Sequence, residues 1–311
     1  MKRFFVLLCV LVVVAGFVAA EDIGITVGVE FYNENITKAD GEPMSSFIMP
    51  YVAYDNSSLL DGALTFHTGV ENYNINLDRE SGPDGGYFPQ DFDFNISLTY
   101  KLSLNSASTL RFYLRDDNNV DISPVHNGTT YTTTSGTINP GVRFTQSTDI
   151  GSLYAQFRTP YDYIRAGRDD TRLRLQSRLG WSSTFGLSLY AQVGSRFIPD
   201  VDYYTGLTLY AAYPTDSLGD FDVTVTIPKE VSSGLTINPT WGYDFENSSI
   251  SLDCTFSGVG TDDDITIDIS PYVEYRAGAW TFYTQFDFTN VTAANGSGMS
   301  ISPTLGVKFE F

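Results

Sequence analysis

Hydrophobic and polar residues alternate along most of the chain. From Asp91 to Leu104, every second residue is apolar, beginning with Phe92 and Phe94, and the residues between them are polar or charged. A period of two places successive side chains on opposite faces of a strand. The segment therefore predicts a strand with one apolar and one polar face, and 23–31 and 301–311 show the same alternation.

About sixteen such segments follow one another, separated by short turns and longer polar connections in alternation. The longest connection is 116–135. Short turns on one rim and longer loops on the other are typical of transmembrane antiparallel up-and-down β-barrels. The sequence therefore predicts an all-β barrel of sixteen strands, or fourteen if the two weakest segments, 109–115 and 221–227, are not strands. The segments lie near 23–32, 46–54, 63–77, 91–104, 109–115, 136–146, 152–159, 172–181, 187–197, 205–213, 221–227, 235–244, 250–256, 265–275, 280–288 and 299–311.

Each even-numbered segment has an aromatic residue on its apolar face, close to the following short turn or the chain end. Aromatic rings at the level of lipid headgroups form a girdle around membrane barrels. We therefore expect the apolar face to contact lipid and the polar face to line the interior. The expected girdle residues are Tyr54, Tyr100, Phe144, Trp181, Tyr213, Tyr243, Tyr275 and Phe309.

The N-terminus predicts secretion. Lys2 and Arg3 precede an apolar run over 4–15, and Val18-Ala19-Ala20 supplies small residues for cleavage, as in a secretory signal peptide. Residues 1–20 are thus expected to be removed, leaving 21–311 as a single barrel domain. After residue 20, no apolar run has the length of about 20 residues that a spanning helix needs.

The charge balance argues against nucleic acid as a partner. The chain has 37 acidic and 18 basic residues, a net charge of −19, and a nucleic-acid-binding domain needs a basic surface to neutralise phosphates. Yet nine of the bases lie on the polar face of six consecutive predicted strands. These bases are Lys101, Arg111, Arg115, Arg143, Arg158, Arg172, Arg174, Arg178 and Arg196.

This arrangement predicts a basic arc on one side of the interior, facing acidic walls. A transverse field of this kind would act on solutes that pass through a channel. The alternative is that the arginines pair with neighbouring acids and only stiffen the wall. The acids expected at the pore wall or its constriction are Asp116, Asp117, Asp121, Glu71, Asp93, Asp268 and Glu274.

Together, the signal peptide, the repeated hairpins and the last strand resemble the porin-type outer-membrane proteins of double-membraned bacteria. The last strand alternates through Leu305, Val307 and Phe309 to a terminal Phe311. In that family, such an end is the signal for the barrel-assembly machinery, and Phe311 is its expected carrier here. The resemblance also implies a third long loop, here 116–135, that folds inward to a constriction, and it implies a homotrimer. The chain lacks the Pro-Glu-Phe-Gly-Gly-type stretch common in that loop.

One strand carries three of the arginines, Arg172, Arg174 and Arg178, as a ladder. Such ladders resemble those of porins selective for acidic oligosaccharides, because arginine forks bind carboxylates and phosphates with two hydrogen bonds.

Catalysis is not expected. His67 and His126 are the only histidines, and the sequence shows neither metal-ligand spacing nor a glycine-rich phosphate loop. We therefore expect an outer-membrane porin without a cofactor, through which small hydrophilic solutes diffuse passively. Two alternatives stay open: a non-conducting surface barrel acting as an adhesin or structural anchor, and a porin selective for acidic solutes.

Overall fold

The computed structural model describes residues 23–34, 45–76, 88–125, 128–164, 171–215, 217–261, 265–291 and 299–310. The signal peptide, Phe311 and His126 lie outside these residues. The first strands are β1 (Ile23–Glu34), β2 (Ser45–Ser58), β3 (Leu64–Asn76), β4 (Phe88–Ser103), β5 (Ser108–Val125), β6 (Gly128–Thr148), β7 (Gly151–Arg158) and β8 (Tyr161–Ile164). The others are β9 (Arg172–Ser183), β10 (Ser188–Ile198), β11 (Asp202–Thr215), β12 (Gly219–Pro228), β13 (Leu235–Asp244), β14 (Ser248–Val259), β15 (Thr266–Ala277), β16 (Trp280–Thr289) and β17 (Ser300–Glu310).

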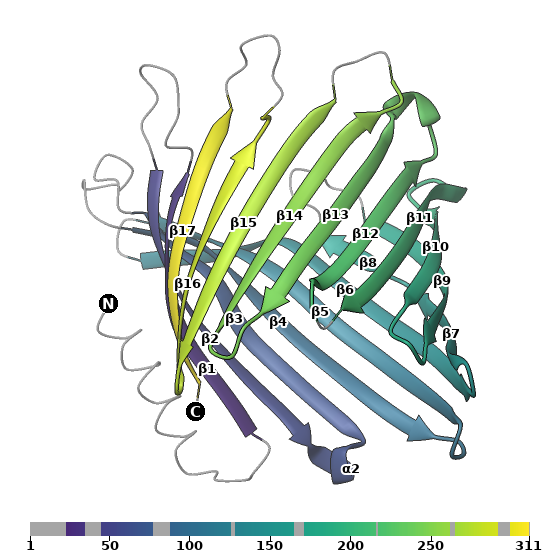
Figure 1. Ribbon diagram of the computed structural model, residues 1–311. Coiled ribbons are helices and arrows are strands. Elements are labelled where there is room, and N and C mark those ends of the chain that lie inside the picture. The colour runs from purple at the N-terminus through teal and green to yellow at the C-terminus, as the bar shows by residue number, and fades with distance from the viewer. Residues whose placement is uncertain are drawn as a thin grey trace.

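These strands form one closed antiparallel barrel (Figure 1). Each strand pairs with its neighbours in the sequence, and β1 closes the barrel by pairing with both β2 and β17. β7 and β8 occupy one position, because both pair with β6 on one side and β9 on the other. The barrel thus has sixteen strands, which confirms the predicted fold and the higher of the two predicted strand counts.

A proline causes the break between β7 and β8. Pro160 has no N–H for the ladder, so a regular strand cannot continue through it. The backbone around it stays bonded to both neighbours: Thr159 N–H donates to Pro140 O at 2.9 Å, and Arg174 N–H donates to Pro160 O at 2.9 Å.

The connection predicted over 116–135 is instead mostly a β-hairpin. β5 continues to Val125 and β6 begins at Gly128, and the two strands pair to their ends, where Val125 faces Gly128. The prediction was wrong about the length of this loop because the alternation of apolar residues ends near Arg115. A strand that extends beyond the bilayer has water on both faces, so its pairing continues without an alternating pattern.

The remaining elements are short and lie in the connections. In the described part of the chain, α2 (Leu59–Gly62) lies at the rim of short turns and η1 (Val231–Ser233) joins β12 to β13 (Figure 1). None of the helices in these ranges has the length and apolar character needed to cross a membrane.

A pocket lined from several strands identifies the inner face. Residues from six consecutive strands, β15 to β17 and β1 to β3, line this pocket together, and Glu30 on β1 and Tyr283 on β16 are among them. Side chains from so many neighbouring strands border one pocket on the concave side of a curved sheet. Glu30 and Tyr283 belong to the polar sets of their strands, so the polar set faces inward. The apolar set faces outward and contains highly exposed residues such as Leu179 (66%) and Leu305 (56%).

Glycines on the inner face let tyrosine rings lie flat on the wall. Gly28 pairs with Tyr51, Gly180 with Tyr154 and Gly306 with Tyr283, each pair on adjacent strands. In all three, a Cβ added to the glycine would overlap carbon atoms of the tyrosine ring. The absence of a side chain at these glycines therefore fixes where the rings lie.

The aromatic residues of the expected girdle lie on the outward set of their strands, near the rim of short turns. Several have a second ring beside them on the same face: Tyr100 stacks on Phe112 with ring centroids 6.5 Å apart, and Trp280 lies 4.6 Å from Phe309. Their contact with lipid headgroups stays a prediction. The eight are Tyr54, Tyr100, Phe144, Trp181, Tyr213, Tyr243, Tyr275 and Phe309.

Candidate functional site: the inner wall

Basic residues lie side by side on the inner wall from β4 to β9. Lys101 pairs in register with Arg111, and Arg111 pairs with Arg143. On the next strands, Gln156 is the partner of both Arg143 and Arg178. This row runs along the hydrogen-bonding direction of the sheet, so consecutive partners are close neighbours on one face.

Three arginines on this side stack on tyrosine rings. The guanidinium carbon of Arg143 lies 3.7 Å from the ring centroid of Tyr154. Arg178 lies 4.0 Å from the centroid of Tyr190, and Arg158 lies 5.7 Å from that of Tyr113. A guanidinium over a ring face is attracted by the ring's negative π-surface. We call these six residues the arginine–tyrosine wall: Arg143, Arg158, Arg178, Tyr113, Tyr154 and Tyr190.

Glutamines hold two of these arginines by hydrogen bonds. Arg178 donates from Nε and Nη2 to the side-chain oxygen of Gln192, at 3.0 and 2.7 Å. Gln156 is buried, and with its amide oxygen turned toward Arg158 it accepts from Nε at 2.6 Å and from Nη2 at 3.1 Å. Amides satisfy N–H donors without carrying a charge, so neither glutamine compensates the charge of its arginine.

Other arginines of the predicted arc are ion-paired. Arg115 Nε lies 2.7 Å from Asp117 Oδ1, and Arg174 Nη2 lies 2.7 Å from Asp162 Oδ1. The carboxylate of Asp162 is nearly buried and also accepts from Thr137 Oγ1 at 2.9 Å. The ladder predicted on one strand is therefore divided, because Arg174 forms an ion pair while Arg178 stacks on a ring.

The two remaining predicted bases, Arg172 and Arg196, lie near the ends of their strands. Arg172 pairs in register with Asp162 at the start of β9. Arg196, at the end of β10, donates from Nε to the backbone oxygen of Asp200 at 3.3 Å.

The opposite side of the inner wall joins tyrosine hydroxyls to carboxylates. Tyr272 donates to Glu274 Oε2 at 2.6 Å, and Tyr283 donates to Glu30. Arg276 Nε lies 2.7 Å from Glu274 Oε1, and Lys308 Nζ lies 3.6 Å from Oε2. The Glu274 side chain is only 8% exposed. Two cations and a hydroxyl thus satisfy one nearly buried carboxylate.

Tyrosine rings extend this second region across several strands. Tyr51 forms a hydrogen bond with Tyr283, and the rings of Tyr272 and Tyr283 lie 5.8 Å apart. They border a pocket of 510 Å³ that Glu71 and Glu310 also line. We call this region the tyrosine–carboxylate wall: Glu30, Glu274, Tyr51, Tyr272 and Tyr283.

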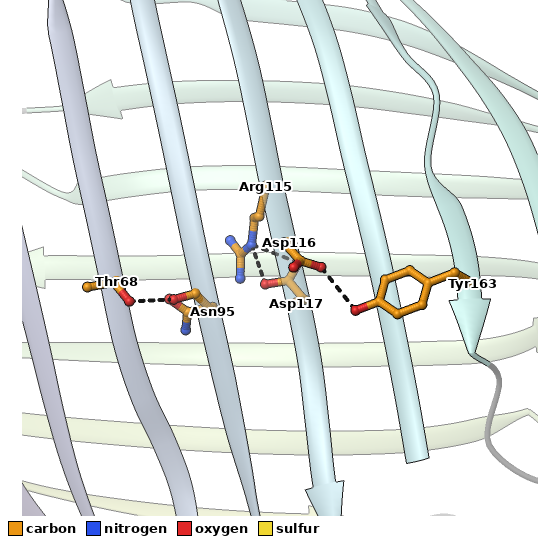
Figure 2. Close-up of polar contacts among 6 residues, drawn as sticks. All are labelled: Thr68, Asn95, Arg115, Asp116, Asp117 and Tyr163. Carbon is orange, nitrogen blue, oxygen red and sulfur yellow. Dashed lines mark hydrogen bonds and ion pairs between the residues drawn. The ribbon is translucent and has the colours of Figure 1, made fainter. Parts of the chain in front are cut away.

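Adjacent acids in the middle of β5 point to opposite faces of the sheet. Figure 2 shows Asp117 beside Arg115 and Asp116 beside Tyr163. Asp117 shares the inner face with Arg115, whereas Asp116 accepts from the hydroxyl of Tyr163 on β8 at 3.4 Å. Adjacent residues of a strand point to opposite faces, so Asp116 lies on the outer face. This corrects the expectation that the Asp116 carboxylate lines the pore. For Asp121 the structure describes the strand but not the side chain.

The other predicted acids face inward beside polar partners. Asp93 accepts from Asn119 Nδ2 at 2.9 Å, and Glu71, Asp93, Arg115 and Asp117 line one pocket of 260 Å³. Asp268 Oδ1 accepts the backbone N–H of Asn290 at 2.8 Å, which ties the end of β16 to β15.

Histidine chemistry has little support. His67 Nδ1 lies 2.7 Å from Asp55 Oδ1, a single pair without a neighbouring nucleophile in its contacts. Across the described ranges, no group of histidine, cysteine and acidic side chains is arranged to hold a metal ion.

Sequence reasoning did not identify the tyrosines and glutamines that hold the arginines. Tyr113, Tyr154 and Tyr190 are aromatic residues on the polar set of their strands, an unusual position that could have singled them out. Gln156 and Gln192 had no such signal, because they are ordinary polar residues on a polar face.

Comparisons with known proteins bear on the architecture. No family model matches the chain, and no curated protein matches it in sequence. Among solved structures, a mutant of the Rh. blastica porin is 13% identical, with a TM-score of 0.47 over 93% of this chain and 100% of that one. CdiB from Acinetobacter baumannii is 7% identical, with a TM-score of 0.55 over 94% of this chain and 60% of its own.

Likenesses at such low identity extend at most to the fold. The closed antiparallel barrel of sixteen strands, with its apolar set outward and its polar set inward, has the architecture of the porin-type outer-membrane β-barrels, as the sequence predicted.

Proposed function

We propose that the protein is an outer-membrane porin through which small hydrophilic solutes and ions diffuse down their gradients. The observation that carries this proposal is the closed sixteen-strand barrel with a charged, polar inner wall. Barrels of 16–18 strands are wide enough to leave an aqueous channel. The helical elements of the described residues, α2 and η1, lie in connections between strands and fill none of this width.

The distribution of charge favours a solute path over a purely structural wall. Arginines from β6, β7 and β9 lie on one side, and carboxylates from β1 and β15 lie on another. Opposite charges on two sides of a narrow channel produce a transverse field that orients dipolar solutes. A structural wall would gain most from pairing its charges locally, yet three arginines stack on rings instead.

The alternative proposal is a non-conducting barrel that serves as a surface anchor or adhesin. Such a protein presents long, varied segments beyond the bilayer, and the β5–β6 hairpin does extend beyond the alternating region. A polar, charged inner wall has no role in that function, so we rank it second. In either case the outward apolar set would contact outer-membrane lipid, and a homotrimer stays a prediction.

The test is single-channel recording from refolded protein in a planar bilayer. A channel gives stable conductance steps, and a salt gradient gives a reversal potential whose sign reports the preferred ion. Folding is checked independently by the shift in gel mobility between unheated and heated samples. A folded barrel that never conducts would overturn the porin proposal and leave the anchor in first place.

A further inference from the structure

We propose that the arginine–tyrosine wall binds small oxyanions that carry two or more negative charges on carboxylate or phosphate groups. The inference deepens the proposed channel function by naming a solute class, and its role in transport rests on that function. The binding itself can be measured without any conductance.

Stacking on a ring covers one face of each guanidinium and leaves its outer edge open. A ring face contacts the plane of the guanidinium, while its N–H donors point outward within that plane. Arg143 and Arg178 lie 3.7 and 4.0 Å from their ring centroids, so their faces are occupied and their edges are oriented. Glutamines occupy the Nε–Nη2 edge of Arg178 and Arg158, so the Nη1–Nη2 edge is the one left for a ligand. Its two parallel N–H donors match the two oxygens of a carboxylate or phosphate.

The existing partners leave the charge uncompensated. Gln192 and Gln156 accept hydrogen bonds from Arg178 and Arg158 but carry no charge. The Nε of Arg143 is buried without a hydrogen-bond partner among the described residues. Arg115 and Arg174 lie on the same side and form ion pairs with carboxylates, and neither belongs to the stacked set.

The three stacked arginines belong to neighbouring positions of the sheet. Arg143 and Arg178 are the register partners of Gln156 from its two sides, and Arg158 lies two residues further along the same strand. Arg158 also interacts electrostatically with both of them. Like charges at this spacing repel one another, and an anion with several charges relieves the repulsion more than a single chloride does.

The tyrosine–carboxylate wall has no such set of arginines without a carboxylate partner among the contacts of the described residues, so the proposed site is confined to the arginine–tyrosine wall. Its carboxylate Glu274 is already satisfied by Tyr272, Arg276 and Lys308. A solute that approaches that wall would have to displace existing partners, whereas an oxyanion at the arginine–tyrosine wall would add the missing ones.

Equilibrium binding to the full-length barrel, refolded in detergent, tests the proposal. Pyrophosphate and propane-1,2,3-tricarboxylate are titrated by calorimetry at constant ionic strength, with chloride as the monovalent reference. The two probes separate phosphate from carboxylate recognition. We expect both to bind more tightly than chloride, and the triple variant Arg143→Gln, Arg158→Gln, Arg178→Gln to weaken that binding about tenfold or more.

A matched variant controls for charge alone. Arg115→Gln removes one positive charge from the same side of the barrel, but from an arginine outside the arginine–tyrosine wall that is paired with Asp117. We expect binding to stay within about twofold of the parent protein, because that guanidinium is already engaged. Arg178→Gln, which removes one charge from a stacked arginine, should weaken binding more than Arg115→Gln does.

Another variant changes no charge. Tyr190→Leu removes the ring under Arg178, and we expect binding to weaken about threefold through loss of the oriented guanidinium. It also keeps the test decisive if the triple variant does not fold.

Several results would overturn the inference: no probe binding more tightly than chloride, an unchanged affinity in the triple variant, or equal losses in Arg115→Gln and Arg178→Gln. Planar-bilayer recording separates the two proposals. A barrel that conducts but does not bind the probes refutes the oxyanion site alone. A barrel that binds them but never conducts refutes the channel.

Discussion

Tyrosine is used in opposite ways on the two sides of the barrel. On the tyrosine–carboxylate wall, Tyr272 and Tyr283 donate their hydroxyls to Glu274 and Glu30. On the arginine–tyrosine wall, Tyr154 and Tyr190 present their ring faces to Arg143 and Arg178. The first use satisfies a charged group, while the second holds a charged group in place without neutralising it.

This difference separates stability from solute recognition. A satisfied carboxylate network strengthens the barrel, and removing a member should lower the free energy of unfolding. A stacked arginine contributes less to stability but presents charge to whatever enters the interior. We therefore expect mutations on the two walls to affect different measurements.

The largest effect on stability should come from Glu274→Ala. This change leaves Arg276 and Lys308 without their shared carboxylate and Tyr272 without its acceptor. A hydrogen bond to a charged group contributes about 1.5–3 kcal/mol, so we expect the loss of the contacts to Glu274 to cost about 3 kcal/mol. Urea unfolding from lipid vesicles, followed by tryptophan fluorescence, measures the loss. The conservative Glu274→Gln is the control and should lose less, because the amide oxygen can still accept from Tyr272. Equal losses in the two variants would contradict a role for the hydroxyl contact.

Arg174 lies on the basic side, but its substitution should mainly lower stability, as on the tyrosine–carboxylate wall. Substitution of Arg178 should not. Arg174→Gln removes the guanidinium that lies 2.7 Å from the nearly buried Asp162, and we expect a loss of about 2–3 kcal/mol. Arg178→Gln should lose clearly less stability, while shifting the reversal potential more strongly toward cations.

A second substitution tests whether the lost Arg174–Asp162 ion pair causes the loss of stability. Adding Asp162→Asn to Arg174→Gln should recover part of the lost stability, since no unpaired charge then remains. If the double variant is as unstable as the single one, the ion pair is not what stabilises this part of the wall.

The same substitution, glycine to alanine, can be made beside a tyrosine of each wall, so that its effects on stability and on anion binding can be compared. Gly180→Ala and Gly28→Ala each place a Cβ against a tyrosine ring, that of Tyr154 and Tyr51 respectively. Overpacking of this kind costs about 2 kcal/mol, and we expect similar losses from both in urea unfolding. Because Tyr154 also holds Arg143, only Gly180→Ala should in addition weaken pyrophosphate binding. Equal weakening in both variants would show that the two walls are not independent.

The fold and the orientation of most side chains could be predicted from the sequence, since both follow from a period of two. That pattern assigned Arg143, Arg158 and Arg178 to the polar face correctly. It did not give their neighbours, because register depends on how each strand is shifted against the next. The position of Gln156 between Arg143 and Arg178 is a property of that register. The pattern also ends where a strand leaves the apolar region, which is why most of the β5–β6 hairpin was predicted as a loop.

The smallest predicted effect separates the two uses of tyrosine most directly. Tyr283→Phe removes the hydroxyl that Glu30 accepts from and keeps the ring over Gly306. We expect a loss of about 1.5 kcal/mol in urea unfolding, the usual contribution of a hydrogen bond to a charged group. Tyr190→Phe keeps the ring face under Arg178 and should change neither stability nor pyrophosphate affinity measurably, because the stacking needs no hydroxyl. If Tyr190→Phe instead weakens pyrophosphate binding as much as Tyr190→Leu does, the hydroxyl rather than the ring face holds Arg178, and the contrast between the walls fails.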